Sequence, residues 1–268
     1  MSATASLLNR SRWGDFYELT KPRIVFLVVV AAAIGYLAGA QESFSWSALL
    51  HLAVGTGLAG AGAGALNQVL ERDVDRRMRR TRSRPIPAGR ITPLEGGAFG
   101  AALAASSIIY LLVTTHPLTA LLAALTIGLY LFVYTPSKRY TPLSTVIGAV
   151  PGAMPPLGGW AAATGQLSAG GWTLFAILFL WQLPHFLAIA WMFREDYAQA
   201  GFPMLPVVDP SGSITDPTGG LRDGDFGPHQ PGSFAPGGHG VAVRVRRLCA
   251  GGLFLLEQSP NGPEAYCC

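Results

Sequence analysis

The stretch ALLHLAVGTGLAGAGAGALNQVLERDVDRRMRRTRSRP, residues 48–85, contains the two features that decide the fold. Its first half has no Asp, Glu, Lys or Arg and belongs to an apolar window long enough to span a bilayer, which takes about 20 residues. Its second half, residues 67–85, brings three acids and seven arginines together. Long apolar windows separated by charged loops are typical of an integral membrane protein.

The composition of the whole chain agrees with this. Of 268 residues, 50% are hydrophobic and only 13% are charged, whereas soluble domains carry about 25% charged residues. The net charge of +4 therefore reports membrane topology and does not indicate nucleic-acid binding. Six windows predict membrane-spanning helices in an all-α polytopic bundle: roughly 24–40, 47–70, 95–115, 117–134, 142–163 and 172–193.

The basic residues predict the orientation of these spans. Up to Asp209 the chain has 15 Lys and Arg, confined to the N-terminal segment 1–23 and to the connections after the second, fourth and sixth windows. A six-helix zigzag puts all of them on one side of the membrane. The positive-inside rule makes that side the cytoplasm, with the N-terminus inside. Segment 1–23 lacks the apolar core of a cleaved signal peptide.

Three polar side chains form a ladder at the end of the second window. Asn67, Glu71 and Asp75 are spaced i, i+4, i+8 and so line one stripe of a helix. Oxygen ligands of this kind can hold Mg²⁺, and the nearby arginines suit phosphate oxygens. The alternative is a solvated loop in which these acids pair with nearby arginines, such as Arg76 and Arg79.

Two further segments place polar groups within or beside spans. Lys138 and Arg139 follow the fourth window, and the next window contains Pro151, Pro155 and Pro156, which predict either a broken helix lining a pocket or a simple kink. The sixth window contains Gln182 and His185. A histidine within a span can ligate haem iron, transfer protons or only bond a neighbouring helix. Glu195 and Asp196 then form a second acidic cluster on the side of the ladder.

Several motifs together resemble the UbiA-type intramembrane prenyltransferases, and more narrowly their haem O synthase branch. The first is N-x-x-x-E-x-x-x-D followed by M-x-R-T-x-x-R-P, at 67–85. The others are LTKPR at 19–23, YTPSKRYTP at 134–142, GAMPPLGGW at 152–160, WQLPHF at 181–186 and DYAQAGFPMLP at 196–206. The resemblance covers roughly residues 15–215, but Ala200 stands where many relatives outside this branch have a second acid after Asp196.

The resemblance implies transfer of a farnesyl group from farnesyl diphosphate to a vinyl group of haem B in the bacterial inner membrane, with the active site facing the cytoplasm. It implies that Asn67, Glu71 and Asp75 bind Mg²⁺ and the diphosphate, and that His185 lies on the haem side. Haem A synthase is a candidate partner. The alternatives are a prenyltransferase of quinone precursors and a non-catalytic haem-binding or transport protein. The remaining diphosphate-binding candidates are Lys21, Arg80, Arg84, Lys138, Arg139 and Asp196.

The resemblance to this family stops near Ile214–Thr215. The family is expected to have nine spans, whereas the predicted membrane domain, 24–209, supplies six. The segment 210–268 is rich in Gly and Pro, which predicts a disordered tail. One hypothesis is a frameshift near Asp216, which would leave the protein without its last spans and can make it inactive. The other is a natural flexible tail. Cys249, Cys267 and Cys268 lie there without metal or redox spacing.

Overall fold

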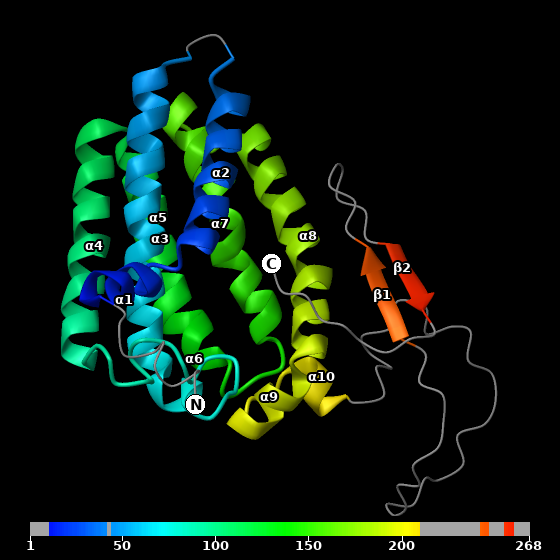
Figure 1. Cartoon of the computed structure of the whole chain (residues 1–268). Helices are drawn as coiled ribbons and strands as arrows, with labels where there is room; N and C mark the ends of the chain where they lie inside the picture. The colour runs from blue at the N-terminus through cyan, green and yellow to red at the C-terminus, as the bar shows by residue number, and fades with distance from the viewer. Residues whose placement is uncertain (1–10, 42–43, 210–241, 247–254, 260–268) are drawn as a thin grey trace, which may run out of the picture. The chain divides into compact units, whose positions relative to one another are not determined.

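The computed structural model describes residues 11–41, 44–209, 242–246 and 255–259, which belong to two units, 1–219 and 220–268. Within the first unit the described residues form a bundle of long helices (Figure 1). The helices are α1 (Arg12–Leu19), α2 (Pro22–Gly39), α3 (Trp46–Asp75), α4 (Pro93–Thr114), α5 (Pro117–Gly128), the π-helical turn η2 (Leu129–Tyr134), α6 (Thr135–Ser137), α7 (Ser144–Thr164), α8 (Ala169–Met192), α9 (Arg194–Ala200) and α10 (Leu205–Val208).

Local sequence signals explain where these helices begin. The side chain of Ser45 accepts a hydrogen bond from the backbone of Ala48 and caps α3. Thr92 and Glu95 form a capping box at the start of α4. Proline stands in the first turn of α2, α4 and α5, where a missing backbone N–H costs nothing.

The structure confirms the helical membrane bundle that the sequence predicts. In the part of the chain that the structure describes, five segments are long and apolar enough to cross a membrane: α2, α3, α4, the continuous stretch Pro117–Ser137, and α8. The predicted window 142–163 also forms a helix, α7, of 21 residues. It is not among the five because proline and glycine replace much of its aliphatic content. The helix α3 runs past the predicted window to Asp75, so the whole acidic ladder is helical.

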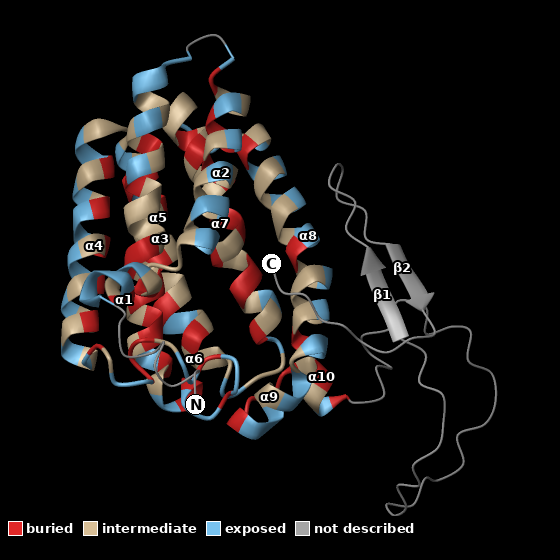
Figure 2. Cartoon of the chain, viewed as in Figure 1, coloured by how far each residue is buried: buried red, intermediate tan, exposed pale blue. Residues whose placement is uncertain are grey.

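The helix α7 lies in the middle of the bundle and packs against α2, α5 and α8. It continues without a break through Pro151, Pro155 and Pro156, so the predicted broken helix is not observed. Its contact with α2 is close: a Cβ at Gly35 would overlap the carbonyl of Pro156. Figure 2 shows that buried residues concentrate on the inward faces of the helices, while outward faces stay exposed, as lipid-facing surfaces do.

One end of the bundle gathers the polar segments. The short helices α6, α9 and α10 lie at the end where α3 stops and where the α3–α4 connection begins, with α1 close by (Figure 1). Val74 and Met78 pack with Phe202 and Met204 there, which joins the end of α3 to the segment after α9. The polar motifs found in the sequence therefore converge at this end.

The second unit contains an antiparallel pair of strands, β1 (Ala242–Arg246) and β2 (Leu255–Ser259). The rest of the predicted tail, including Cys249, Cys267 and Cys268, lies outside the described residues. The frameshift near Asp216 and the nine-span expectation therefore stay predictions.

Candidate functional site

The acidic ladder occupies the last turns of α3 and is buried. Asn67, Glu71 and Asp75 are 2%, 5% and 1% exposed. They share one stripe of the helix, as their spacing predicts. The carboxylates are therefore not part of a solvated loop. Asp73 points elsewhere, since its side chain is exposed and pairs with Arg72 and Arg76.

Each rung of the ladder pairs with a basic side chain from a different segment. Lys21, at the α1–α2 junction, donates to Oδ1 of Asn67 over 2.9 Å. Lys138, directly after α6, donates to Oε1 of Glu71 over 2.9 Å. Arg84, in the α3–α4 connection, donates to Oδ2 of Asp75 over 2.7 Å. Long-range partners thus stand in place of Arg76 and Arg79, the partners that the alternative interpretation offered for Glu71 and Asp75.

The basic side chains of this cluster are close enough to act on one another. Burial, and next the positive charge of Arg84, lowers the pKa of Lys21 from 10.5 to about 7. An anion placed among these cations would favour their charged forms and relieve this repulsion. The cluster is therefore suited to receive a multiply charged anion.

The segment formed by the π-helical turn η2 and the helix α6 brings additional groups to the ladder. Thr135 accepts a hydrogen bond from Nδ2 of Asn67 at 3.2 Å and donates to the carbonyl of Tyr130 at 2.8 Å. The ammonium group of Lys138 lies 4.5 Å from the centre of the Tyr134 ring. A Cβ at Gly148 of α7 would overlap that ring, so α7 fixes its position. Sequence reasoning missed Thr135 and Tyr134, although both lie within the YTPSK motif.

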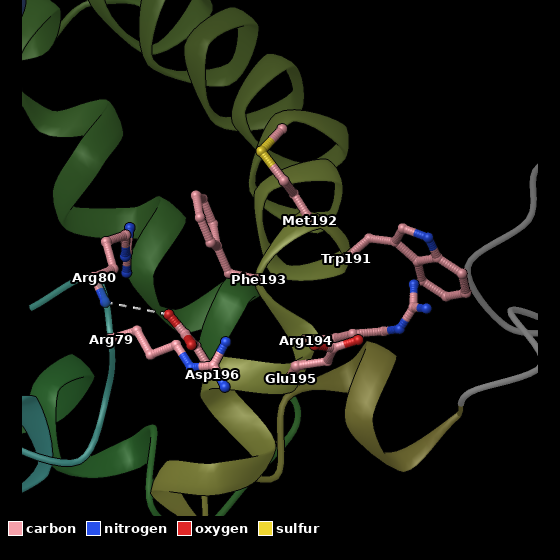
Figure 3. A pocket seen from close by; sticks show the side chains of 8 residues that line it. All are labelled: Arg79, Arg80, Trp191, Met192, Phe193, Arg194, Glu195 and Asp196. Carbon is pink, nitrogen blue, oxygen red and sulfur yellow. Dashed lines mark hydrogen bonds between the residues drawn. The ribbon is translucent and has the colours of Figure 1, made fainter. Parts of the chain in front are cut away.

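The α3–α4 connection also meets α9. The backbone N–H of Arg80 donates to Oδ2 of Asp196 at 3.4 Å. The Arg80 guanidinium lies 4.7 Å from the centre of the Phe193 ring and donates to the hydroxyl of Tyr197 at 3.4 Å. Arg80, Phe193 and Asp196 border a pocket of about 560 Å³, and Figure 3 shows the backbone nitrogen of Arg80 next to the Asp196 carboxylate. Its lining residues are Arg79, Arg80, Trp191, Met192, Phe193, Arg194, Glu195 and Asp196.

The sequence matches a known protein family over more than half of its length. Residues 28–213 match the sequence model of the UbiA prenyltransferase family. The chain belongs to the UbiA prenyltransferase family. Two relatives of this family member are protoheme IX farnesyltransferases. That of Solibacter usitatus is 50% identical over 205 residues, which cover 73% of this chain and 70% of the relative. That of Opitutus terrae is 48% identical over 212 residues, which cover 79% and 71%.

Solved structures of UbiA homologues share the fold. The apo UbiA homologue from Aeropyrum pernix superposes with a TM-score of 0.60 at 21% identity and covers 71% of this chain and 73% of its own. The homologue from Archaeoglobus fulgidus bound to GPP and Mg²⁺ gives 0.59 at 17% identity and covers 75% and 71%. At such low identity the likeness shows the fold alone.

Besides Arg80 and Asp196, two further predicted site residues of this UbiA family member lie apart from the paired ladder. Arg139 is exposed and donates to the carbonyl of Leu70, at 3.3 Å. His185 stacks on Trp181 of its own helix with the ring centres 5.1 Å apart. The ring contacts of His185 within the described segments are thus intrahelical, and its haem-side role stays a prediction.

The donor set at the ladder fits Mg²⁺. Among the described residues no group of three or more His, Cys, Asp and Glu could hold a metal. The ladder instead offers two carboxylates and one amide. Oδ1 of Asp75 is buried and has no hydrogen-bond partner, so a strong acceptor remains available. Mg²⁺ is usually bound by one or two carboxylates together with water and substrate phosphates, which matches this sparse set.

Proposed function

We propose that this integral membrane protein transfers a farnesyl group from farnesyl diphosphate to a vinyl group of haem B, and so produces haem O and diphosphate. The observation that carries the proposal is the buried ladder on α3, in which each rung meets a cation from another segment. The sequence similarity to protoheme IX farnesyltransferases supports haem B as the acceptor.

The basic side chains would bind and orient the diphosphate. Lys21, Arg84 and Lys138 converge on the ladder and can turn from their present partners to phosphate oxygens. Arg80 and Arg139 border the same end of the bundle. Mg²⁺ held by Asn67, Glu71 and Asp75 would help to neutralise the diphosphate.

The chemistry follows from this charge distribution. When the C1–O bond of farnesyl diphosphate breaks, the electron pair leaves with the diphosphate, and the fixed cations stabilise the growing negative charge. The vinyl group of haem B attacks the allylic cation and forms the new C–C bond. Water then adds to the resulting cation and loses a proton, which gives a hydroxyethylfarnesyl side chain. The apolar helices around the site would keep water away from the first cation.

The location of the site follows the same reasoning. All 15 Lys and Arg up to Asp209 lie in the segments predicted to share one side of the membrane. We place this end of the bundle, and the N-terminus, in the cytoplasm, with the protein in the bacterial inner membrane. Whether haem A synthase is a partner stays a prediction.

The decisive experiment supplies membranes containing the full chain with farnesyl diphosphate, haem B and Mg²⁺. Haem O, identified by chromatography and mass, is the expected product. A parallel reaction offers an aromatic quinone precursor in place of haem B. Prenylation of that acceptor alone would reassign the enzyme within its family, and no prenylated product with either acceptor would reject the proposal.

A further inference from the structure

The junction between α1 and α2 holds Lys21 in an uncommon backbone conformation. Lys21 has φ 51° and ψ 58°, in the left-handed region. Among the described residues it is the one non-glycine residue with positive φ. Side chains with a Cβ avoid this region, and Pro22 directly afterwards restricts the backbone of Lys21 further. Such a conformation persists only where surrounding contacts fix it, and it is found most often at functional sites.

Arg90 supplies contacts that fix the helix before this junction. Its Nε donates to Oδ1 of Asp15 at 2.7 Å, and its Nη2 donates to Oε2 of Glu18 at 3.2 Å. Asp15 is 4% exposed, so this ion pair is shielded from water. Arg90 therefore joins α1, which ends at Leu19, to the last residues of the α3–α4 connection.

The remaining terminal nitrogen of Arg90 contacts the α3–α4 connection. Its Nη1 donates to the backbone carbonyl of Ser83 at 2.8 Å. Ser83 precedes Arg84, the residue that pairs with Asp75. One guanidinium thus holds both the helix that leads to Lys21 and the loop that carries Arg84.

The junction between α1 and α2 also packs against α3. Nε2 of Gln68 donates to the carbonyl of Leu19 at 3.3 Å. A Cβ at Gly64 would stand 3.5 Å from both that carbonyl and the side chain of Lys21, so the junction lies directly on α3. Lys21 then reaches Asn67, one residue before Gln68.

We infer that Arg90, with Asp15 and Glu18, forms a latch that positions Lys21 and Arg84 for the diphosphate. This inference rests on the proposed function. Among the described residues, Arg90 and Asp15 bond to each other, and Arg90 also bonds to Glu18 and Ser83 and not to a rung of the ladder. The latch residues are therefore positioning residues and not catalytic ones. The competing explanation is that Arg90 only stabilises the fold, in which case its loss would act independently of Lys21.

A double-mutant cycle separates these explanations. The variants are Arg90→Ala, Asp15→Asn and Lys21→Ala, each alone, and Arg90→Ala combined with Lys21→Ala. The measured quantity is the affinity for inorganic pyrophosphate in Mg²⁺, with KM for farnesyl diphosphate and for haem B alongside. The latch predicts that Arg90→Ala weakens pyrophosphate binding about 10- to 100-fold, as removal of a supporting partner does.

The same cycle predicts how the effects combine. Once Lys21 is replaced, Arg90→Ala should cost distinctly less than it does alone, because part of its effect passes through Lys21. KM for haem B should not change. Arg90→Lys should recover part of the lost affinity, since it keeps a charge beside Asp15. Arg12→Ala is the matched control, because it breaks an exposed ion pair between α1 and Glu95 and should change little.

Amide hydrogen exchange tests the latch without any ligand. Arg90→Ala should speed exchange at residues 12–25, whereas Arg12→Ala should not. Unchanged exchange in Arg90→Ala would overturn the latch, and fully additive losses in the cycle would overturn its link to Lys21. If the wild-type chain binds pyrophosphate but makes no haem O, the proposed function fails while the latch is still judged by these two readouts.

Discussion

Nζ of Lys138 donates to Oε1 of Glu71 across 2.9 Å, and the two side chains are only 13% and 7% exposed. The pair joins the end of the fourth span to the ladder on α3. A charge at this depth is costly without its partner, because little water remains to solvate it. The diphosphate site is thus assembled from charges that also depend on one another for stability.

Replacing Lys138 should therefore affect folding and activity differently. We expect Lys138→Met to destabilise the protein in detergent by about 3–5 kcal/mol, because Glu71 loses its partner. The double variant Lys138→Met with Glu71→Gln removes both charges and should regain most of that stability. It should not regain haem O formation. Thermal unfolding and turnover measured on both variants check this, and a double variant as unstable as the single one would contradict it.

Asp75 should matter more for turnover than for folding, because the side chain of its partner Arg84 is 27% exposed and keeps part of its solvation when Asp75 is lost. Asp75→Asn keeps the size of the side chain but removes the carboxylate whose Oδ1 has no hydrogen-bond partner. We expect kcat/KM to fall by about two orders of magnitude, the loss that follows removal of one charge-stabilising group. The matched control is Asp73→Asn, two residues away on the exposed side of the same helix. Equal activity of the two variants would remove Asp75 from the site.

The sequence was sufficient to predict the spans and the ladder, because both depend on short-range periodicity. A run of apolar residues and an i, i+4, i+8 spacing determine which side chains share a helix face. The basic side chains that pair with the ladder could not be predicted in the same way. The pairing of Glu71 with Lys138 depends on how the ends of α3 and α6 meet, which no local pattern contains.

Other features depend on packing and could not be derived from the sequence alone. The π-helical turn at Leu129–Tyr134 lies in a uniformly apolar run, which predicts an ordinary α-helix. Lys21 precedes a proline, but its left-handed backbone lies where α1 contacts both Gln68 of α3 and Arg90, and no local pattern shows these contacts. The sequence also did not show that α7 is continuous, since its prolines were compatible with both a kink and a break. Strain of this kind is decided by tertiary contacts.

The close contact between α2 and α7 gives a prediction about stability. A Cβ at Gly159 would overlap the carbonyl of Ala32, whereas one at Gly158 meets nothing within 4 Å. Gly159→Ala should cost about 1–3 kcal/mol, because the helix backbones must move apart. Gly158→Ala should be neutral or slightly stabilising, since alanine favours the helix. Unfolding of the two purified variants in detergent compares neighbouring positions directly, and equal stabilities would argue against this contact.

Removal of divalent cations should stop the reaction at the binding step. The ladder supplies few ligands of its own, so we expect diphosphate and Mg²⁺ to bind together. In the presence of a chelator the affinity for pyrophosphate should fall along with turnover, and added Mg²⁺ should restore both. The measurement is pyrophosphate binding by calorimetry. Binding that is unaffected by the chelator would show that Lys21, Arg84 and Lys138 suffice without a metal.

His185 tests whether haem B approaches from α8. A lone histidine in a span can bond a haem propionate or ligate the iron. A hydrogen bond to a charged group contributes about 1.5–3 kcal/mol. Its loss in His185→Ala should therefore raise KM for haem B about tenfold or more and leave KM for farnesyl diphosphate unchanged.

The control for His185 is another histidine within a span. His51 lies near the start of α3, whereas the ladder lies at the end of that helix. Its Nδ1 is 2.8 Å from the hydroxyl oxygen of Tyr110. His51→Ala should leave KM for haem B as it is. The visible spectrum of bound haem separates the two roles of His185, because only loss of an iron ligand shifts it. If KM for haem B is the same in both variants and the wild type, haem B binds elsewhere, and the pocket bordered by Phe193 and Trp191 becomes the next place to test.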